Sequence, residues 1–369
     1  MSRPWDNQPS GVMRALVLTS PGQEPPSACF TYTEAYPRPS LPGPGWVLVR
    51  IRATGINRAE LRGRAAAPAF PGEWSLWQKF YRPEPPQILG EELVGEVVEA
   101  AKDTPFKPGD KVASTHAGGG KAFDGSYAEY AICHSRRVYH LPQDTTLSWE
   151  LLGALPMSFL TAYGMVMISA RLGSRPPGSS VIVHGATSSV GVFAVLIAKD
   201  QGASVIATTR QAKKVDQLKH CGADHVLLES ELDEKIPQIL PDGADVVVEL
   251  VGADQSMRAL GWTALFGSVV VSGVLNSSAI VEGFSPFLIP TTRNLSFYSV
   301  ANDGIGDHDA GARHTDIEPI FAYAVKKIES GKWNKEHFVD SVYHLSDIGK
   351  AHERAEKNEA TGKLVVLVP

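Results

Sequence analysis

The chain has 369 residues, a net charge of −5, 43% hydrophobic residues and 20% charged residues. The length is more than twice the ~150 residues of a common single domain and favours two domains. The composition is that of a soluble globular protein and excludes a fibrous or largely disordered chain. The weakly acidic balance offers no general basic surface for nucleic acid or anionic lipid, so the expected partner is a small molecule.

The chain contains only three cysteines, Cys29, Cys133 and Cys221, and no CxxC pair. This count excludes a disulfide framework and a cysteine zinc site. The first residues, MSRPWDNQPSGV, lack the apolar stretch of a secretory signal. The longest apolar run, 190–198, is about half of the ~20 residues that cross a bilayer. We therefore expect a cytoplasmic protein with free thiols and no membrane contact.

Short β-rich runs separated by Gly and Pro occupy the chain from Val12 to about Leu141. They are VMRALVLTS, WVLVRIRATGI, ELVGEVVEAA, DKVAS and YAEYAICH. Runs of this kind, with turns such as Pro108-Gly109-Asp110, predict a compact barrel-like β domain. The next segment, WELLGALPMSFLTAYGMVMI, is expected to be helical except at Pro156 and to lead into a second domain.

Six apolar, β-branched runs recur between residues 181 and 300, namely VIVH, SVIAT, VLL, DVVVEL, SVVVS and LSFYSV. Most of them start about 20 residues apart, which suits one strand and one crossover helix per repeat. This spacing predicts a six-stranded, doubly wound parallel sheet. The first crossover helix, about 190–201, is apolar nearly all round and is expected to be buried.

The parallel pattern stops after Val300. A helix with apolar residues on one face is expected over 317–328, and the chain closes with a strand, KLVVLV. We expect this tail to fold back onto the first domain. The predicted organisation is a catalytic domain over 12–155, a nucleotide-binding domain over 156–304 and a return to the catalytic domain over 305–369.

A glycine- and serine-rich turn, Gly185-Ala186-Thr187-Ser188-Ser189-Val190-Gly191, directly follows VIVH. In dinucleotide-binding folds the spacing GxGxxG gives a tight turn and close backbone approach to the pyrophosphate. Here those positions hold Ala186, Ser188 and Gly191, so the motif alone is weak. The strand before it and the helix after it carry the interpretation as a dinucleotide site. The alternative is an ordinary turn that binds nothing.

The end of the second predicted strand indicates which dinucleotide is preferred. An NAD-preferring site usually has an acidic residue there, which binds the ribose 2′-hydroxyl. This chain has Thr208-Thr209-Arg210, then Lys213 and Lys214, and no acidic residue from 202 to 215. A hydroxyl, a guanidinium and an ammonium suit a 2′-phosphate, which favours NADPH. The alternative is that these cations only solvate a helix start.

Several motifs in order resemble the medium-chain dehydrogenase/reductase superfamily, in its zinc-independent quinone oxidoreductase and enoyl reductase branch. They are GINRAE (55–60), ILGEELVG (88–95), PGDKV (108–112), GSYAEY (125–130), LTAY (160–163), GADHV (222–226) and TGKLV (361–365). The resemblance runs from about Met13 to the last residue. It implies an α/β fold in which a doubly wound parallel Rossmann sheet is inserted in a GroES-like, β-barrel-type catalytic domain.

The zinc-dependent members of this superfamily differ from this chain at their metal ligands. They have Cys, His and Cys or a related ligand where this chain has Asn57, Glu91 and Met157. An amide, a carboxylate and a thioether are a poor set for zinc, so the resemblance implies an enzyme without metal. Without a Lewis acid, conjugated acceptors are favoured because hydride addition gives a delocalised enolate or phenolate.

The resemblance also implies roles for individual residues. Asn57 and Thr161 are expected near the nicotinamide or the substrate carbonyl as catalytic residues, although Asn57 could instead cap its own loop. Glu92 is expected to be structural. The proton donor stays open among Tyr81, Tyr127, Tyr163, Tyr298 and water. The expected cofactor-binding residues are Thr187, Ser188, Ser189, Val190, Thr209, Arg210, Lys214, Val251, Gly252 and Lys363.

The sequence thus predicts an NADPH-dependent, zinc-independent reductase of a quinone or an α,β-unsaturated carbonyl compound. One alternative is an enoyl thioester reductase of fatty-acid or polyketide secondary metabolism, alone or with an acyl-carrier partner. A second is an NADPH-binding protein without turnover.

The insert after Arg64, with Trp74, Trp77 and Tyr81, is interpreted as a substrate lid or as a loop on its own domain. The chain is expected to be a homodimer, paired through LSFYSV, or a monomer.

Overall fold

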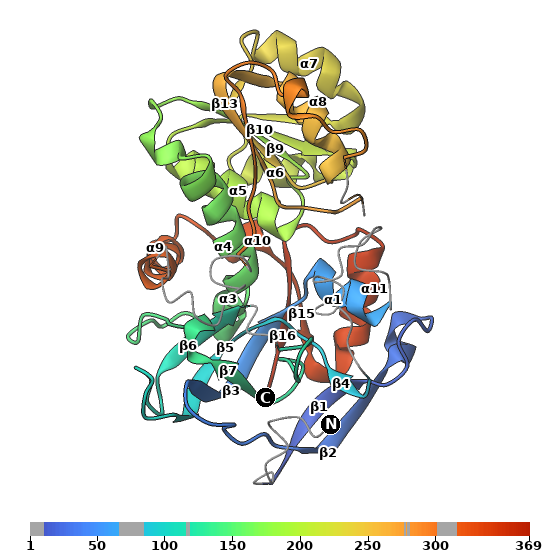
Figure 1. Cartoon of the computed structure of the whole chain (residues 1–369), viewed down its shortest axis with the longest axis vertical. Coiled ribbons are helices and arrows are strands. Elements are labelled where there is room, and N and C mark those ends of the chain that lie inside the picture. Colours follow the sequence, from blue (N-terminus) through green and yellow to red (C-terminus); the bar gives the residue numbers. More distant parts are fainter. Residues whose placement is uncertain (1–10, 66–84, 116–118, 277, 279–280, 301–315) are drawn as a thin grey trace. The chain divides into compact units, whose positions relative to one another are not determined.

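The computed structural model describes residues 11–65, 85–115, 119–276, 278, 281–300 and 316–369. The chain divides into two compact units (Figure 1). Unit 1 comprises Met1–Met157, Thr315–Lys332 and Val339–Pro369, and unit 2 comprises Ser158–His314 and Trp333–Phe338. The sequence prediction kept all of 305–369 with the first domain, whereas Trp333–Phe338 belongs to unit 2 here. Trp74, Trp77 and Tyr81 lie outside the described residues, so the lid hypothesis stays a prediction.

The described part of unit 1 forms two sheets. The small sheet has the strand order β2-β1-β4, and the larger one has the order β15-β16-β3-β5-β6-β8, with β7 also paired to β3. Their bounds are β1 Val12–Leu18, β2 Phe30–Pro37, β3 Trp46–Gly55, β4 Gln87–Ile88, β5 Glu92–Ala100, β6 Lys111–Thr115, β7 Tyr130–His134, β8 Val138–His140, β15 Val339–His344 and β16 Lys363–Leu367. Val49, Ile51, Leu93 and Val366 belong to one buried core in these strands.

The closing strand β16 pairs antiparallel with β3 and parallel with β15. The C-terminal segment therefore completes the larger sheet of unit 1. Within the described residues of unit 1, the sheets are accompanied by the helices α1 (Arg58–Arg64), α3 (Trp149–Gly153), α9 (Glu318–Glu329) and α11 (Ile348–Glu356). Tyr127, one of the proton-donor candidates, is fully buried in this core, and its hydroxyl contacts His352 Nε2 at 3.0 Å.

Unit 2 contains the predicted parallel sheet. All six predicted strands are present: β9 (Ser180–His184), β10 (Ser204–Thr209), β11 (His225–Leu228), β12 (Ala244–Glu249), β13 (Thr263–Val271) and β14 (Asn294–Phe297). The order is β11-β10-β9-β12-β13-β14, which is the 3-2-1-4-5-6 order of a Rossmann sheet. The order reverses between β9 and β12, and dinucleotides bind at the carboxyl ends of the strands beside such a switch point.

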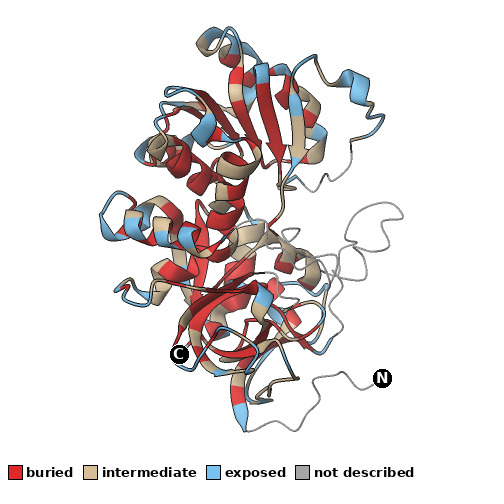
Figure 2. Cartoon of the chain, turned by 60° about the vertical axis from the view of Figure 1, so that its left-hand side comes forward, coloured by how far each residue is buried: buried red, intermediate tan, exposed pale blue. Residues whose placement is uncertain are grey.

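Helices α5 (Ser189–Asp200), α6 (Val215–His220), α7 (Leu232–Ile239) and α8 (Ser256–Gly261) flank this sheet (Figure 1), and α10 (Lys335–Phe338) packs against α5. Helix α4 (Pro156–Tyr163) includes the residues at which the chain passes from unit 1 to unit 2. Helix α5 is buried continuously from Gly191 to Ala198, as its apolar sequence predicts. Its Phe193 ring lies 5.7 Å from that of Phe159 and 5.1 Å from that of Phe338. Strands are mostly buried, and exposed residues concentrate on turns and outer helices (Figure 2). None of the described helices is long and apolar enough to cross a membrane.

Candidate functional site

The turn between β9 and α5 is closed by its own side chains and backbone. Gly185 has a φ of +84°, which favours glycine. Ser188 is the N-cap of α5: its hydroxyl accepts from Gly191 N at 3.1 Å and donates to Gly185 O at 2.9 Å. A Cβ on Gly191 would lie 2.6 Å from Gly185 O. The turn is therefore tight, and it presents the N-terminus of a twelve-residue helix, where anions bind.

The other predicted residues around this turn have different surroundings. Thr187 and Val190 are partly exposed. The Ser189 hydroxyl accepts from Ser158 of α4 at 2.9 Å, and Thr161 of the same helix is only 8% exposed. Thr187, Ser188, Ser189 and Val190 thus share one helix start, whereas the Thr161 side chain is largely buried.

The basic segment after β10 lies beside the same turn. Thr208 accepts a hydrogen bond from Gly185 N at 3.1 Å, and the Thr209 hydroxyl accepts one from Gln211 N at 3.1 Å. Arg210 is exposed, whereas Lys214 is only 6% exposed and ends a 3-10 turn, Ala212–Lys214. Among the predicted phosphate-binding cations, Arg210 thus has more solvent access than Lys214.

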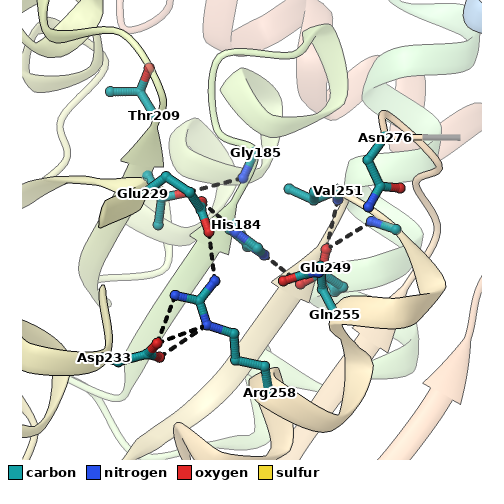
Figure 3. Close-up of polar contacts among 12 residues, drawn as sticks. His184, Gly185, Thr209, Glu229, Asp233, Glu249, Val251, Gln255, Arg258 and Asn276 are labelled. Carbon is teal, nitrogen blue, oxygen red and sulfur yellow. Dashed lines mark hydrogen bonds and ion pairs between the residues drawn. The ribbon is translucent and has the colours of Figure 1, made fainter. Parts of the chain in front are cut away.

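The ends of β9, β11 and β12 are connected by charged side chains (Figure 3). His184 lies between two carboxylates: its Nδ1 is 2.6 Å from Glu249 Oε2, and its Nε2 is 2.8 Å from Glu229 Oε2. The other Glu249 oxygen accepts hydrogen bonds from Val251 N at 2.6 Å and Gly252 N at 3.3 Å. Val251 and Gly252, two predicted cofactor contacts, are therefore held by a buried carboxylate.

Burial of His184 opposes its charged form. The hydrogen bonds to Glu229 and Glu249 and the charges of both carboxylates outweigh burial and raise the pKa of His184 to about 9. The imidazole is therefore protonated at neutral pH, and it donates to both carboxylates.

A second polar cluster lies in unit 1 and contains Asn57, Glu60, Glu92 and Lys363. Lys363 Nζ donates to Asn57 Oδ1 at 2.6 Å and pairs with Glu92 Oε1 at 2.5 Å, and neither charged side chain is exposed to solvent. The Asn57 amide nitrogen donates to Glu60 Oε1 at 3.1 Å and Glu92 Oε1 at 2.9 Å. Asn57 can therefore donate to a substrate carbonyl only by exchanging one of these bonds. Lys363, a predicted cofactor contact, is held inside this cluster.

The cluster continues to Glu91 and Lys121. Glu60 Oε1 accepts from Glu91 N at 3.1 Å, and the Glu91 carboxylate pairs with Lys121 at 2.8 Å. Three carboxyl groups thus accompany two lysines, and the cluster is neutral when one carboxyl holds a proton. Burial, followed by the charge of Glu91, raises the pKa of Glu60 to about 8, which favours holding that proton on Glu60.

Replacing Glu60 by Gln is expected to flatten the pH dependence of stability. The folded pKa of Glu60, about 8, exceeds its ordinary 4.5. Between these values the unfolded chain releases the proton that the folded chain keeps, so the free energy of unfolding falls as pH rises. The slope is at most about 1.4 kcal/mol per pH unit. Urea unfolding from pH 5 to 8 measures it, with the exposed Glu99→Gln as control. Parallel pH curves for E60Q and wild type would refute this ionisation.

The positions of the zinc ligands in related dehydrogenases do not fit a metal here. Asn57 is hydrogen-bonded to Glu60, Glu92 and Lys363, and Glu91 pairs with Lys121. Met157 offers a thioether, while its N–H donates to Glu92 at 2.7 Å. This donor set is unsuited to zinc. In the part of the chain that the structure describes, no group of three His, Cys, Asp or Glu residues could hold a metal ion.

Sequence reasoning missed most of the His184 and Glu60 contacts. One signal was present: His184, Glu229 and Glu249 are ionisable residues at or just after the ends of apolar strands. A buried charge at such a position requires a partner. For Glu60, the Asn57-x-x-Glu60 spacing is that of a capping box, and Glu60 Oε2 does accept from Asn57 N at 2.8 Å.

Comparisons with known proteins agree with this architecture. Residues 43–143 match the model of the alcohol dehydrogenase GroES-like domain, and residues 189–306 match the model named zinc-binding dehydrogenase. The human synaptic vesicle membrane protein VAT-1 homolog is 26% identical, over 97% of this chain and 87% of its own length. Human quinone oxidoreductase is 27% identical, over 89% of this chain and 91% of its own length.

A solved structure shares the fold over nearly the whole chain. It is that of a mycobacterial protein in complex with NADPH, with a TM-score of 0.72 and 22% identity, covering 96% of this chain and 99% of the other. The two family models match the barrel-type unit and the Rossmann unit in this order along the chain. The chain therefore belongs to the quinone oxidoreductase-like branch of the medium-chain dehydrogenase/reductase superfamily, whose oxidoreductases use NAD(P).

Proposed function

We propose that this oxidoreductase uses NADPH to reduce a conjugated acceptor, a quinone or an α,β-unsaturated carbonyl compound, without a metal ion. The observation that carries the cofactor assignment is the basic end of β10. Exposed Arg210 follows Thr209 there, and no acidic residue occurs from 202 to 215. An acidic residue at this point would repel a 2′-phosphate, whereas a guanidinium pairs with it. The NADPH in the related mycobacterial structure supports this assignment.

The residues of unit 2 have separate tasks in this proposal. When bound, NADPH supplies the hydride. The N-terminus of α5, at Ser188, Ser189 and Val190, binds the pyrophosphate with backbone N–H groups. Arg210 binds the 2′-phosphate, and the Val251–Gly252 backbone contacts the nicotinamide side. Thr161 keeps its proposed role of hydrogen-bonding the acceptor carbonyl. Asn57, in unit 1, keeps its own proposed catalytic role, for which its amide exchanges one bond of its cluster.

The absence of suitable zinc ligands among Asn57, Glu91 and Met157 supports the choice of acceptor. Reduction of a simple ketone concentrates charge on one oxygen, which a Lewis acid stabilises by several kcal/mol. A quinone or an enone spreads that charge, so hydrogen-bond donors can suffice. This physical difference favours conjugated acceptors for the chain.

An acceptor panel tests the proposal. NADPH oxidation is measured with a quinone, an enone, an enoyl thioester and a simple ketone, each with and without a metal chelator. We expect turnover with the quinone or the enone, unchanged by the chelator. Turnover confined to the thioester would instead identify an enoyl thioester reductase, alone or with an acyl-carrier partner. Tight NADPH binding without acceptor-dependent oxidation would identify a non-catalytic binding protein.

Arg210→Ala is expected to weaken NADPH binding about 10- to 100-fold and to leave NADH binding nearly unchanged. The lost interaction is a charge-assisted bond to the 2′-phosphate, which NADH lacks. Fluorescence titration with both cofactors measures the two dissociation constants. Lys219→Ala removes another exposed cation, on α6, and should leave both constants unchanged. Equal weakening of NADPH and NADH by R210A would contradict the assignment.

The oligomeric state is proposed as a homodimer. Strand β14 pairs only with β13 among the described residues, and large exposed apolar side chains lie on or near these strands. They are Leu265, Phe266, Phe287, Leu288 and Phe297. A second copy could pair through this sheet edge. Sedimentation equilibrium decides between dimer and monomer.

A further inference from the structure

We propose that His184 is a positioning residue: by bridging Glu249 and Glu229 it joins the ends of β9, β12 and β11 and fixes the Val251–Gly252 backbone for the dinucleotide. This inference rests on the proposed NADPH binding and extends it to a residue that does not itself contact the cofactor. Figure 3 shows the imidazole between the two carboxylates.

The first half of the bridge is entirely buried. His184 and Glu249 are 0% exposed and lie opposite each other in the register of β9 and β12. The two carboxylate oxygens of Glu249 have different partners. Oε2 contacts His184 Nδ1, and Oε1 accepts hydrogen bonds from the backbone N–H groups of Val251 and Gly252. The imidazole therefore sets the rotation of the carboxylate that holds this loop.

The loop has little freedom to compensate for a turned carboxylate. A Cβ on Gly252 would lie 2.1 Å from Asn276 Oδ1 and 2.6 Å from Asp254 Oδ1. Asn276 N also donates to Val251 O at 2.8 Å. Because these neighbours already enclose the backbone, it cannot follow a turned carboxylate, and the Val251 and Gly252 N–H groups then lose the acceptor that holds them.

The second half of the bridge reaches η6, the 3-10 turn Glu229–Glu231 after β11. Glu229 Oε2 contacts His184 Nε2, and its Oε1 accepts from Arg258 of α8 at 2.6 Å. Arg258 in turn pairs with Asp233 of α7 at 3.0 Å. The ring of Trp262, next to α8, packs edge-on to the imidazole at 5.4 Å. The charged groups around His184 are therefore Glu249, Glu229, Arg258 and Asp233.

Only the protonated imidazole can make both contacts as a donor. A neutral ring has one N–H, so one carboxylate would face a nitrogen lone pair. Because the pKa of His184 is raised to about 9, this loss occurs in the alkaline range. NADPH affinity is then expected to fall above about pH 9, whereas turnover at saturating NADPH changes less.

The test compares three variants with the wild type from pH 7 to 10.5. Fluorescence titration measures NADPH affinity, and steady-state kinetics with an acceptor that the panel shows to be reduced measures kcat and the KM for NADPH. Glu229→Gln keeps an acceptor oxygen but removes a charge, and should move the alkaline loss of affinity about one pH unit lower. His184→Asn should weaken NADPH binding about tenfold at pH 7 and raise the KM for NADPH more than it lowers kcat. It should also abolish the loss of NADPH affinity at alkaline pH. Exposed Glu234→Gln, on α7, removes a like charge and should match the wild type.

Circular dichroism verifies that each variant is folded. If His184→Asn unfolds, Glu229→Gln still tests the proposal, because Glu229 is partly exposed and its substitution is better tolerated. Wild-type affinity in H184N, or an alkaline loss that E229Q does not move, overturns the positioning role alone. Failure of the wild type to bind NADPH at any pH overturns the proposed function and this inference together.

Discussion

Replacing Lys363 by methionine is expected to lower the free energy of unfolding by about 3–5 kcal/mol. Lys363 and Glu92 are both 0% exposed and pair at 2.5 Å. Without the ammonium, Glu92 is a buried carboxylate beside the protonated Glu60, and Asn57 Oδ1 loses its donor. Such a charge is costly because burial removes its hydration and no cation replaces it. Urea unfolding monitored by circular dichroism measures the change.

Two comparisons separate a buried charge from a merely shortened side chain. The double variant Lys363→Met with Glu92→Gln removes both charges and should recover a large part of the lost stability. Arg52→Met breaks a partly exposed pair, Arg52–Glu96, and should cost less than about 1 kcal/mol. If K363M is as stable as R52M, the buried Lys363–Glu92 pair contributes no more to the free energy of unfolding than the partly exposed pair does.

Gly191→Ala is expected to destabilise unit 2 by about 1–3 kcal/mol and to weaken NADPH binding at least about tenfold. A Cβ at this position would lie 2.6 Å from Gly185 O and 2.7 Å from Ala186 Cα, and both are backbone atoms. The backbone must therefore shift, which displaces the N-cap hydroxyl of Ser188 and the helix start. Thermal unfolding and fluorescence titration measure the two effects.

A second helical glycine provides the matched control. Gly261 ends α8, and a Cβ there meets no atom within 4 Å. Gly261→Ala should be neutral or stabilising by up to about 1 kcal/mol, since alanine has the higher helix propensity. If G191A behaves like G261A, the turn does not need the close approach at Gly191.

The parallel sheet was predictable because its strands are buried on both faces. VIVH and DVVVEL are nearly continuous apolar runs, and they became β9 and β12 almost residue for residue. The strand before it and the apolar run after it predicted a helix from about residue 190, and α5 begins at Ser189. In unit 1 the runs are interrupted by polar and charged residues, so periodicity indicated β structure but not which strands pair.

The polar contacts were harder to predict because they depend on register and distance in space. Nothing local pairs His184 with Glu249, 65 residues later; adjacent, in-register β9 and β12 bring them together. The phosphate contact of Lys214 stays a prediction, and the burial of this side chain could not be read from its chemical class. For Asn57, the resemblance suggested a substrate contact, whereas its amide is hydrogen-bonded within a carboxylate and lysine cluster.

The pairing of β16 with β3 has a consequence for the order in which the protein can form during synthesis. Lys363 reaches Asn57 across 306 residues, so the larger sheet of unit 1 cannot be completed until the whole of unit 2, which ends at Phe338, has been synthesised. The Rossmann strands, by contrast, all lie between Ser180 and Phe297 and become available together. A nascent chain should therefore assemble the inserted sheet first, while the early strands of unit 1 await their last partner.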